Sequence, residues 1–334
     1  FPPGAEPMVH VGSRVRPEQV LATYRPPDVP FRVPIAAPLR RSAARARDAM
    51  TAVPGTTLAA ADPLAAYGRR EVRSPAGGIL LSYDETDGSA LIAPFGPPQP
   101  VVGHVRGEVT ALDPGGIDIS MAASVVDGVG GSGDAVHGEL LVAVHEPGDE
   151  LRASAIDAGA TGHIVVGGSR ASAETLIRAR AMGVAGIVLG GMLDKELRDF
   201  EAIQHRRSEV GGLSGGLGLL LIEGFGKVGL DQQLFDWFRQ QAGHMASLFG
   251  ADGRLYVYAA PPPPARFPLP IPGDRVIAHR RPFAGRGGTL LRIVDGLHAA
   301  PSGVRCVVAI VRFEDGRTAA VPLANLEATR PYEA

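Results

Sequence analysis

The chain has 334 residues, a formal net charge of -2 at pH 7 and a sequence pI near 6.5. This length predicts two or three domains. The balanced charge excludes an overall electrostatic attraction of the protein to nucleic acid or to acidic membranes. The single cysteine, Cys306, excludes an internal disulfide and any cysteine-based metal cluster. The high count of glycine (44) and proline (29), with 5% aromatic residues, favours short strands and tight turns. No apolar run reaches the length of a membrane-spanning helix.

The first hundred residues contain an internal repeat. Gly12-x-x-Val15 is followed by Leu21-Ala22, and Gly55-x-x-Leu58 is followed at the same spacing by Leu64-Ala65. Each copy predicts a strand, a glycine turn and a second strand. Over residues 8–93 the pattern resembles the barrel-sandwich hybrid of biotinyl and lipoyl carrier domains. Such carriers need a modifiable lysine, and no lysine precedes Lys195, so we expect the fold without the carrier function for residues 1–100.

Residues 101–150 are predicted to form a β-rich extension. For the glycine-rich loop at 128–134 we prefer a hairpin or bulge over an anion-binding nest of backbone amides. His137 and His145 are eight residues apart, which on a regular strand would place them on one side. Two histidines without a third ligand do not make a zinc site, so no metal is predicted.

Residues 151–258 alternate between strand and helix patterns. Apolar runs at 164–166, 185–189 and 217–222 each end in glycines and precede a helix-like segment, at 172–182, 193–203 and 230–241. In the first of these segments we place Leu176, Ile177 and Ala181 on one apolar stripe. A further strand is expected at 245–249. Strand, glycine turn and helix, repeated in this way, predict a parallel α/β sheet.

The third glycine turn has the spacing GxGxxG, with Gly224, Gly226 and Gly229 as the candidate cofactor-binding residues. A dinucleotide site places this motif on the first strand of its unit, with an acidic residue after the next strand. Here it lies on the third strand, and the helix is expected only after the third glycine. A phosphate-binding P-loop fails because Val228 follows Lys227. We therefore prefer a simple turn and predict no cofactor.

Nucleophilic and acid–base chemistry are not indicated by any spacing in the chain. A GxSxG pattern at 212–216 precedes its strand, whereas a nucleophile elbow follows one, so we interpret it as a glycine-rich loop. No HExxH and no CxxC occurs. Carboxylate pairs cannot be told from solvated surface charge. No catalytic residue is predicted, and whether the protein is an enzyme stays open, with a non-enzyme preferred.

The C-terminal segments are predicted to form a connector and a small barrel. Residues 259–272 are rich in proline and predict a semi-rigid linker. Residues 273–334 resemble an SH3-like barrel of the KOW type, which implies contacts with RNA or with other proteins. The basic residues that would make weak nucleic-acid contacts are Arg275, Arg280, Arg281, Arg286 and Arg292. The region lacks the interleaved aromatic residues that stack on bases, so nucleic acid is not favoured.

Taken end to end, the chain resembles an uncharacterised bacterial family from thermophilic, filamentous lineages. The resemblance rests on the N-terminal VGxxVxPxxVLA, on GVAGIVLGGMLDKELxDF, on LLLIEGFGK and on the KOW-like tail. No activity is attached to that family, so the resemblance implies an architecture only.

The leading hypothesis is a non-catalytic scaffold or assembly subunit that associates with proteins, including copies of itself, with a repeating polymer or filament as one form. An RNA- or ribosome-associated factor acting through the KOW-like barrel is one alternative. A nucleotide-dependent enzyme using the glycine turns is another. The absence of disulfides slightly favours the cytoplasm. Because the chain begins at Phe1, we expect that a leader or an N-terminal segment is missing.

Overall fold

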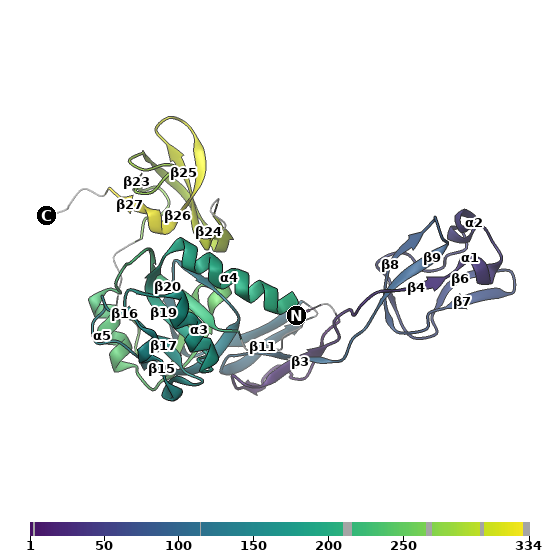
Figure 1. The fold of residues 1–334 in the computed structure, drawn as a ribbon, viewed down its shortest axis with the longest axis horizontal. Helices are drawn as coiled ribbons and strands as arrows, with labels where there is room; N and C mark the ends of the chain where they lie inside the picture. Colours follow the sequence, from purple (N-terminus) through teal and green to yellow (C-terminus); the bar gives the residue numbers. More distant parts are fainter. Residues whose placement is uncertain (3, 114, 210–215, 265–268, 301–303, 330–334) are drawn as a thin grey trace. The chain divides into compact units, whose positions relative to one another are not determined.

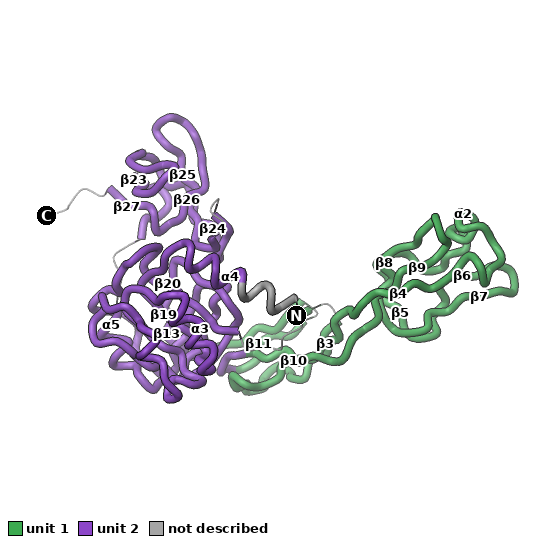
Figure 2. Tube along the Cα trace, in the orientation of Figure 1, with its two compact units in different colours: residues 1–103, 108–120 green, residues 104–107, 121–334 purple. Residues whose placement is uncertain are grey.

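The computed structural model describes residues 1–2, 4–113, 115–209, 216–264, 269–300 and 304–329. The described part of the chain is mainly β-sheet, with several sheets and a mixed α/β part. Residues 1–103 with 108–120 form unit 1, and residues 104–107 with 121–334 form unit 2 (Figure 2). No helix among the described residues is long and apolar enough to cross a membrane.

Unit 1 consists of short strands and two short helices (Figure 1). Its first and last segments supply β1 (Glu6–Pro7), β2 (Arg14–Val15), β3 (Val20–Tyr24), β10 (Gln99–Val102), β11 (Gly107–Asp113) and β12 (Gly116–Ser120). These strands form two sheets, ordered β1-β3-β10 and β12-β11-β2. The segment between supplies β4 (Phe31–Pro34), α1 (Ala36–Leu39), α2 (Ala43–Arg47), β5 (Thr57–Leu58), β6 (Pro63–Tyr67), β7 (Arg70–Arg73), β8 (Gly78–Asp84) and β9 (Ser89–Pro94). Its sheets are β4-β9-β8-β5 and the hairpin β6-β7.

The internal repeat has the same local structure in both copies. Gly12 and Gly55 have φ angles of 86° and 92°, in the left-handed region that favours glycine. Each glycine is followed by a two-residue strand (β2 or β5) and then by a five-residue strand (β3 or β6). The copies do not pair with each other, because β2 and β3 pair with β1, β10 and β11, whereas β5 and β6 pair with β8 and β7. Each copy therefore belongs to its own set of sheets.

Unit 2 is built on a sheet of 13 strands. Its α/β part supplies β13 (Ala123–Asp127), β14 (Gly130–Ser132), β15 (Ala135–Val142), β17 (Ile164–Val166), β19 (Gly186–Met192), β20 (Gly218–Phe225), β21 (Met245–Phe249) and β22 (Arg254–Tyr258), and beside it β16 (Glu150–Leu151) pairs with β18 (Arg170–Ala171). The order is β13-β22-β21-β15-β17-β19-β20-β14. Only β15, β17, β19 and β20 run parallel within this order, so the central sheet is mixed, whereas the sequence pattern predicted a parallel one.

Helices cover both faces of this sheet, as expected for strands that are apolar throughout. The helical segments are η1 (Ala153–Ala155), η2 (Ala158–Ala160), α3 (Ala173–Ala181), α4 (Asp194–Glu209), α5 (Gln232–Gln240) and η3 (Gly250–Asp252). Successive residues of β17 alternate between the two cores: Ile164 and Val166 join the cluster of α5, and Val165 joins that of α3 and α4. The period of two in a strand thus builds two separate apolar layers.

Local signals explain where α3 and α5 begin. The Ser172 hydroxyl accepts a hydrogen bond from the Thr175 N–H at the start of α3. The predicted stripe of this helix was partly wrong: Leu176 is buried, but Ile177 is 60% exposed and Ala181 is exposed. The buried positions are 175, 176 and 179, which share a face at the spacing of three and four residues. Thr175 and Ala179 thus take the buried places that the sequence pattern gave to Ile177 and Ala181.

The glycine-rich stretch at 128–133 contains a strand, which the sequence pattern did not predict. β14 inserts between β20 and β25 (Arg305–Phe313). A side chain on Gly128 or Gly131 would collide with the backbone oxygens of β20, and one on Gly133 with Leu217 O. These glycines are thus needed for close backbone approach, so neither a free hairpin nor an anion nest describes the stretch.

A five-stranded antiparallel module ends unit 2. It comprises β23 (Arg275–Ala278), β24 (Gly287–Ala299), β25, β26 (Thr318–Pro322), η4 (Leu323–Asn325) and β27 (Leu326–Ala328). The strands are ordered β27-β23-β24-β25-β26, and the core lies between them. Phe283, in the loop after β23, stacks on Phe313 with ring centroids 4.7 Å apart. This ring contact holds the 279–286 loop against the module's core.

Candidate functional site

The glycine turns of the α/β sheet are filled by the protein's own backbone. A side chain on Gly168 would collide with the carbonyl oxygen of Asp149, and one on Gly190 with that of Val228. Parallel sheets bind ligands at the carboxyl ends of their strands, which is where these turns lie. Here the chain segments at 147–149 and 226–230 pass over those ends instead.

The GxGxxG residues are spread over three different environments. Gly224 is still part of β20, and a Cβ there would lie 3.5 Å from the Cβ of Ala324 in η4. A Cβ on Gly226 would meet nothing within 4 Å, although its φ of 111° favours glycine. A Cβ on Gly229 would lie 2.9 Å from Pro147 O. The motif therefore borders the C-terminal module and the 147 loop, and its glycines do not converge on one pocket.

The helix after the motif has an occupied N-terminus. α5 begins at Gln232, and Asp231 caps it by accepting hydrogen bonds from Gln233 N–H at 2.9 Å and Leu234 N–H at 3.1 Å. The Glu223 carboxylate accepts from the Asp231 N–H at 3.3 Å. A pyrophosphate uses such amides at a helix start within the motif. The carboxylates of Asp231 and Glu223 already accept hydrogen bonds from the amides at this helix start. Their negative charge would repel a phosphate.

Phe225, between the first two glycines of the motif, packs into the joint between the α/β sheet and the C-terminal module. Its partners there are Ala300, Cys306 and Val308, which are buried. Gly130 pairs with Cys306 in the antiparallel register. Burial raises the pKa of the Cys306 thiol to about 11. The joint is therefore a dry, packed contact with a backbone pairing in it.

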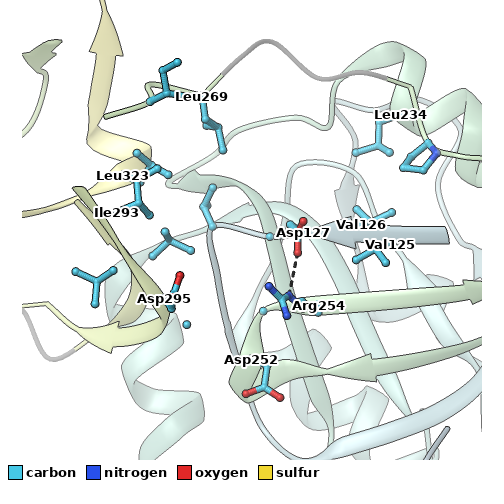
Figure 3. A pocket seen from close by; sticks show the side chains of 18 of the residues that line it. Val125, Val126, Asp127, Leu234, Asp252, Arg254, Leu269, Ile293, Asp295 and Leu323 are labelled. Atoms are coloured by element: carbon cyan, nitrogen blue, oxygen red, sulfur yellow. Dashed lines mark hydrogen bonds and ion pairs between the residues drawn. The ribbon is translucent and has the colours of Figure 1, made fainter. Parts of the chain in front are cut away.

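A groove lies beside this joint, between β22 and the far part of β24 (Figure 3). Its cavity volume is about 570 Å³, and a second cavity of about 420 Å³ continues it past Asp252, Arg254 and Asp295. The walls of the first cavity are mostly apolar and come from β13, β24 and the proline-rich connector. The second cavity is bordered by Met121, Phe249 and Tyr256. Sequence reasoning missed this groove because its residues are far apart in the chain.

Carboxylates dominate the charge of the groove. Asp127 Oδ1 accepts from Arg254 Nε at 3.1 Å, so this pair is neutralised (Figure 3). The side chains of Asp252 and Asp295 form no ion pair with any residue that the structure describes. Phe249 and Tyr256 are packed edge to face, with centroids 5.7 Å apart. Carboxylates beside aromatic rings are the complement of a cation.

The five arginines predicted to meet nucleic acid divide into two groups. Arg275 pairs with Glu314 at 2.6 Å and Arg286 pairs with Asp315 at 2.8 Å. Arg280, Arg281 and Arg292 are exposed and have no carboxylate partner within the described parts of the chain. The β25–β26 turn thus neutralises part of the basic patch that the sequence suggested.

His137 lies beside His104, whereas the spacing in the sequence had grouped it with His145. β15 ends at Val142, so His145 lies beyond the strand. The Nδ1 atoms of His137 and His104 are 3.1 Å apart. Burial, and then the charge of His137, lowers the pKa of His104. Across the described residues no group of three His, Cys, Asp or Glu side chains could hold a metal ion.

The GxSxG stretch at 212–216 lies outside the described residues, except for Gly216. In comparisons with known proteins, no family model, no curated protein and no solved structure matches this chain. The family resemblance noted in the sequence therefore stays a prediction.

Proposed function

We propose that the protein is a non-catalytic scaffold or assembly subunit that associates with proteins, including copies of itself. The observation that best supports this is the use made of the GxGxxG strand end. Gly224 lies beneath Ala324, and Phe225 fills the joint to the C-terminal module. Residues that a nucleotide enzyme would turn toward its ligand instead connect two parts of one unit. A fixed connection between modules is expected in a scaffold, because a scaffold holds its partners in a defined arrangement.

The strand edges of unit 2 offer places for such partners. β13 ends the central sheet and pairs with β22. A strand at a sheet edge presents backbone N–H and C=O groups to which another chain can add. Val125 on β13 is 39% exposed, which adds an apolar contact at that edge. Self-association through such contacts would produce oligomers, with a polymer or filament as the open form.

The finer fold assignments belong to the same proposal. The five-stranded module at 273–328, with η4 before its last strand, supports an SH3-like barrel of the KOW type. For residues 8–93 the barrel-sandwich hybrid would bring both repeat copies into common sheets. Because the copies pair separately, we propose that each one seeds its own small β module. Membership of the thermophilic, filamentous bacterial family is proposed on the sequence resemblance alone.

The oligomeric state tests the scaffold proposal. Light scattering after size exclusion, over a hundredfold range of protein concentration, should show a mass that rises with concentration. Electron microscopy of the concentrated sample should show a repeating arrangement of copies. A particle that keeps the mass of one chain at every concentration would refute self-association.

A second candidate, an RNA-associated factor, is favoured by one observation. Arg280, Arg281 and Arg292 remain exposed without carboxylate partners among the described residues. Filter binding to a single-stranded RNA across a salt series measures their contribution. Three phosphate contacts on a single strand predict a slope of log K against log salt of roughly -2. Binding that does not depend on salt would exclude this function.

A further inference from the structure

We propose that the groove between β22 and β24 binds arginine side chains, and that its occupant is the 279–286 loop of a second copy of this chain. This inference rests on the proposed function, since it names the contact through which copies associate. It joins two features of unit 2: an acidic, aromatic groove and an exposed arginine pair without carboxylate partners among the described residues.

The groove has the chemistry that a guanidinium group requires. Asp252 and Asp295 line both cavities, and neither forms an ion pair within the described residues. With Asp127 and Arg254, they make three carboxylates against one guanidinium. A carboxylate accepts two parallel hydrogen bonds from arginine, and an aromatic ring accepts the guanidinium on its face. Tyr256 and Phe249 border the second cavity and supply such rings.

The groove keeps its shape through contacts of its two walls. Gly253 has a left-handed φ of 70°, and a Cβ there would lie 3.2 Å from Leu297 of β24. The register between β24 and β25 shifts between Ile293 and Leu297, so the 294–296 segment bulges out of the ladder. Asp295 is on this bulge. The bulge therefore carries a carboxylate into the groove while Leu297 seals the wall behind it.

The 279–286 loop has the complementary charge. Arg280 and Arg281 are exposed, whereas Arg286 at the end of the loop is paired with Asp315. The loop is held in shape by the stacking of Phe283 on Phe313 and by a hydrogen bond from Gly285 N–H to Ala278 O at 2.7 Å. A preorganised loop loses little conformational entropy when it binds. Its two arginines match in number Asp252 and Asp295, the groove carboxylates that form no ion pair within the described residues.

The loop of the same copy cannot fill this groove. It joins β24 at Gly287, whereas Asp295 lies eight residues further along the same strand. At about 3.3 Å per residue an extended strand of that length spans roughly 26 Å, so the loop and the groove lie at different parts of β24. Because the loop and the groove are different surfaces, a contact between them is heterologous and leaves a free loop and a free groove at the two ends. Repetition of this contact builds a closed ring or an open polymer, depending on the rotation between neighbouring copies.

Two neutralising double variants test the contact. Asp252→Asn with Asp295→Asn removes the groove charge, and Arg280→Gln with Arg281→Gln removes the loop charge. Each variant alone should associate roughly tenfold or more weakly than the unchanged protein in sedimentation velocity. An equal mixture should form one-to-one pairs that grow no further, because only one loop and one groove remain intact in each pair. Far-UV circular dichroism checks that both variants fold.

The control is Arg152→Gln with Arg239→Gln, which removes two exposed arginines elsewhere in unit 2 and should leave association unchanged. If the unchanged protein associates and both groove and loop variants associate equally well, this contact is refuted while self-association stands. If the unchanged protein is strictly monomeric, both proposals are refuted. A synthetic peptide of residues 278–287 should bind the unchanged protein and lose affinity for the Asp252→Asn, Asp295→Asn variant. Equal binding to both proteins would also refute arginine recognition by the groove.

Discussion

Gly130 of β14 lies opposite Cys306 of β25, and this pairing continues the central sheet into the C-terminal module. The Val307 N–H extends it with a hydrogen bond to Val129 O at 2.9 Å. A proline-rich segment alone would leave the two parts tethered but free to move. Because backbone pairing and the packed side chain of Phe225 supplement the tether, we expect the joint to open only with substantial unfolding.

The thiol of Cys306 should report on this joint. Burial raises its pKa to about 11, and the residue is 1% exposed, so little thiolate forms at pH 8 and little of it is accessible. We expect an aromatic disulfide reagent to react roughly a hundredfold or more slowly with the native protein than with the protein in denaturant. Absorbance of the released thiolate measures both rates. The Cys306→Ser variant is the blank, and equal rates in the two states would contradict a closed joint.

Gly190 should not tolerate even a methyl group. Its Cβ would collide with the backbone of Val228 and Gly229, which cannot move without displacing the covering segment. We expect Gly190→Ala to lower the free energy of unfolding by about 1–3 kcal/mol, as overpacking does. Urea denaturation followed by circular dichroism measures this. Gly148→Ala is the matched control, because a Cβ there would meet nothing within 4 Å, and an equal loss in both variants would argue against the close approach.

Stability should fall as the pH drops below about 6.5. Burial lowers the pKa of His104 from its usual 6.5, and the neighbouring charge of His137 adds to this. Between the lowered pKa and 6.5 the unfolded chain binds more protons than the folded protein, so the unfolding free energy decreases as pH falls. Thermal unfolding at several pH values between 5 and 8 should show a steeper fall for the natural chain than for His104→Gln. Parallel curves would exclude His104 as the cause.

Arg32 should control the acidity of Asp84. Its guanidinium lies 2.8 Å from the carboxylates of both Asp84 and Asp87, and its hydrogen bond is the main cause that lowers the pKa of Asp84 to about 2. In Arg32→Gln we expect that pKa to move back toward 3.8. A carboxyl carbon NMR titration of both proteins measures the change. Since these groups lie on the surface, little change in stability is expected, and an unchanged pKa of Asp84 would contradict the pairing.

Much of the local structure could be predicted from the sequence because its causes are local. The strands at 164–166 and 245–249 were predicted with the bounds that the structure has. The helix predicted at 230–241 occurs at Gln232–Gln240, and its start follows from the capping aspartate Asp231. The helix predicted at 193–203 continues to Glu209. Periodicity and capping act within a few residues, so the sequence displays them directly.

The candidate sites could not be predicted in the same way. The partner of His137 is His104, 33 residues earlier, whereas His145 had the more regular spacing. The groove brings together Asp252 and Asp295 from separate modules. Of the five predicted arginine contacts, Arg275 and Arg286 are paired with carboxylates of the β25–β26 turn. No local pattern indicates which distant charge a side chain will meet.

By itself, the sequence determined the glycine positions and the strand–helix alternation, because backbone conformation and periodicity depend on near neighbours. Only the tertiary structure decided the structural role of each glycine. β14 became a strand because β20 and β25 lie on either side of it, and the GxGxxG strand end became a joint because η4 packs beside Gly224. Such roles arise from contacts between segments that are 80 or more residues apart, and those contacts form only when the chain has folded.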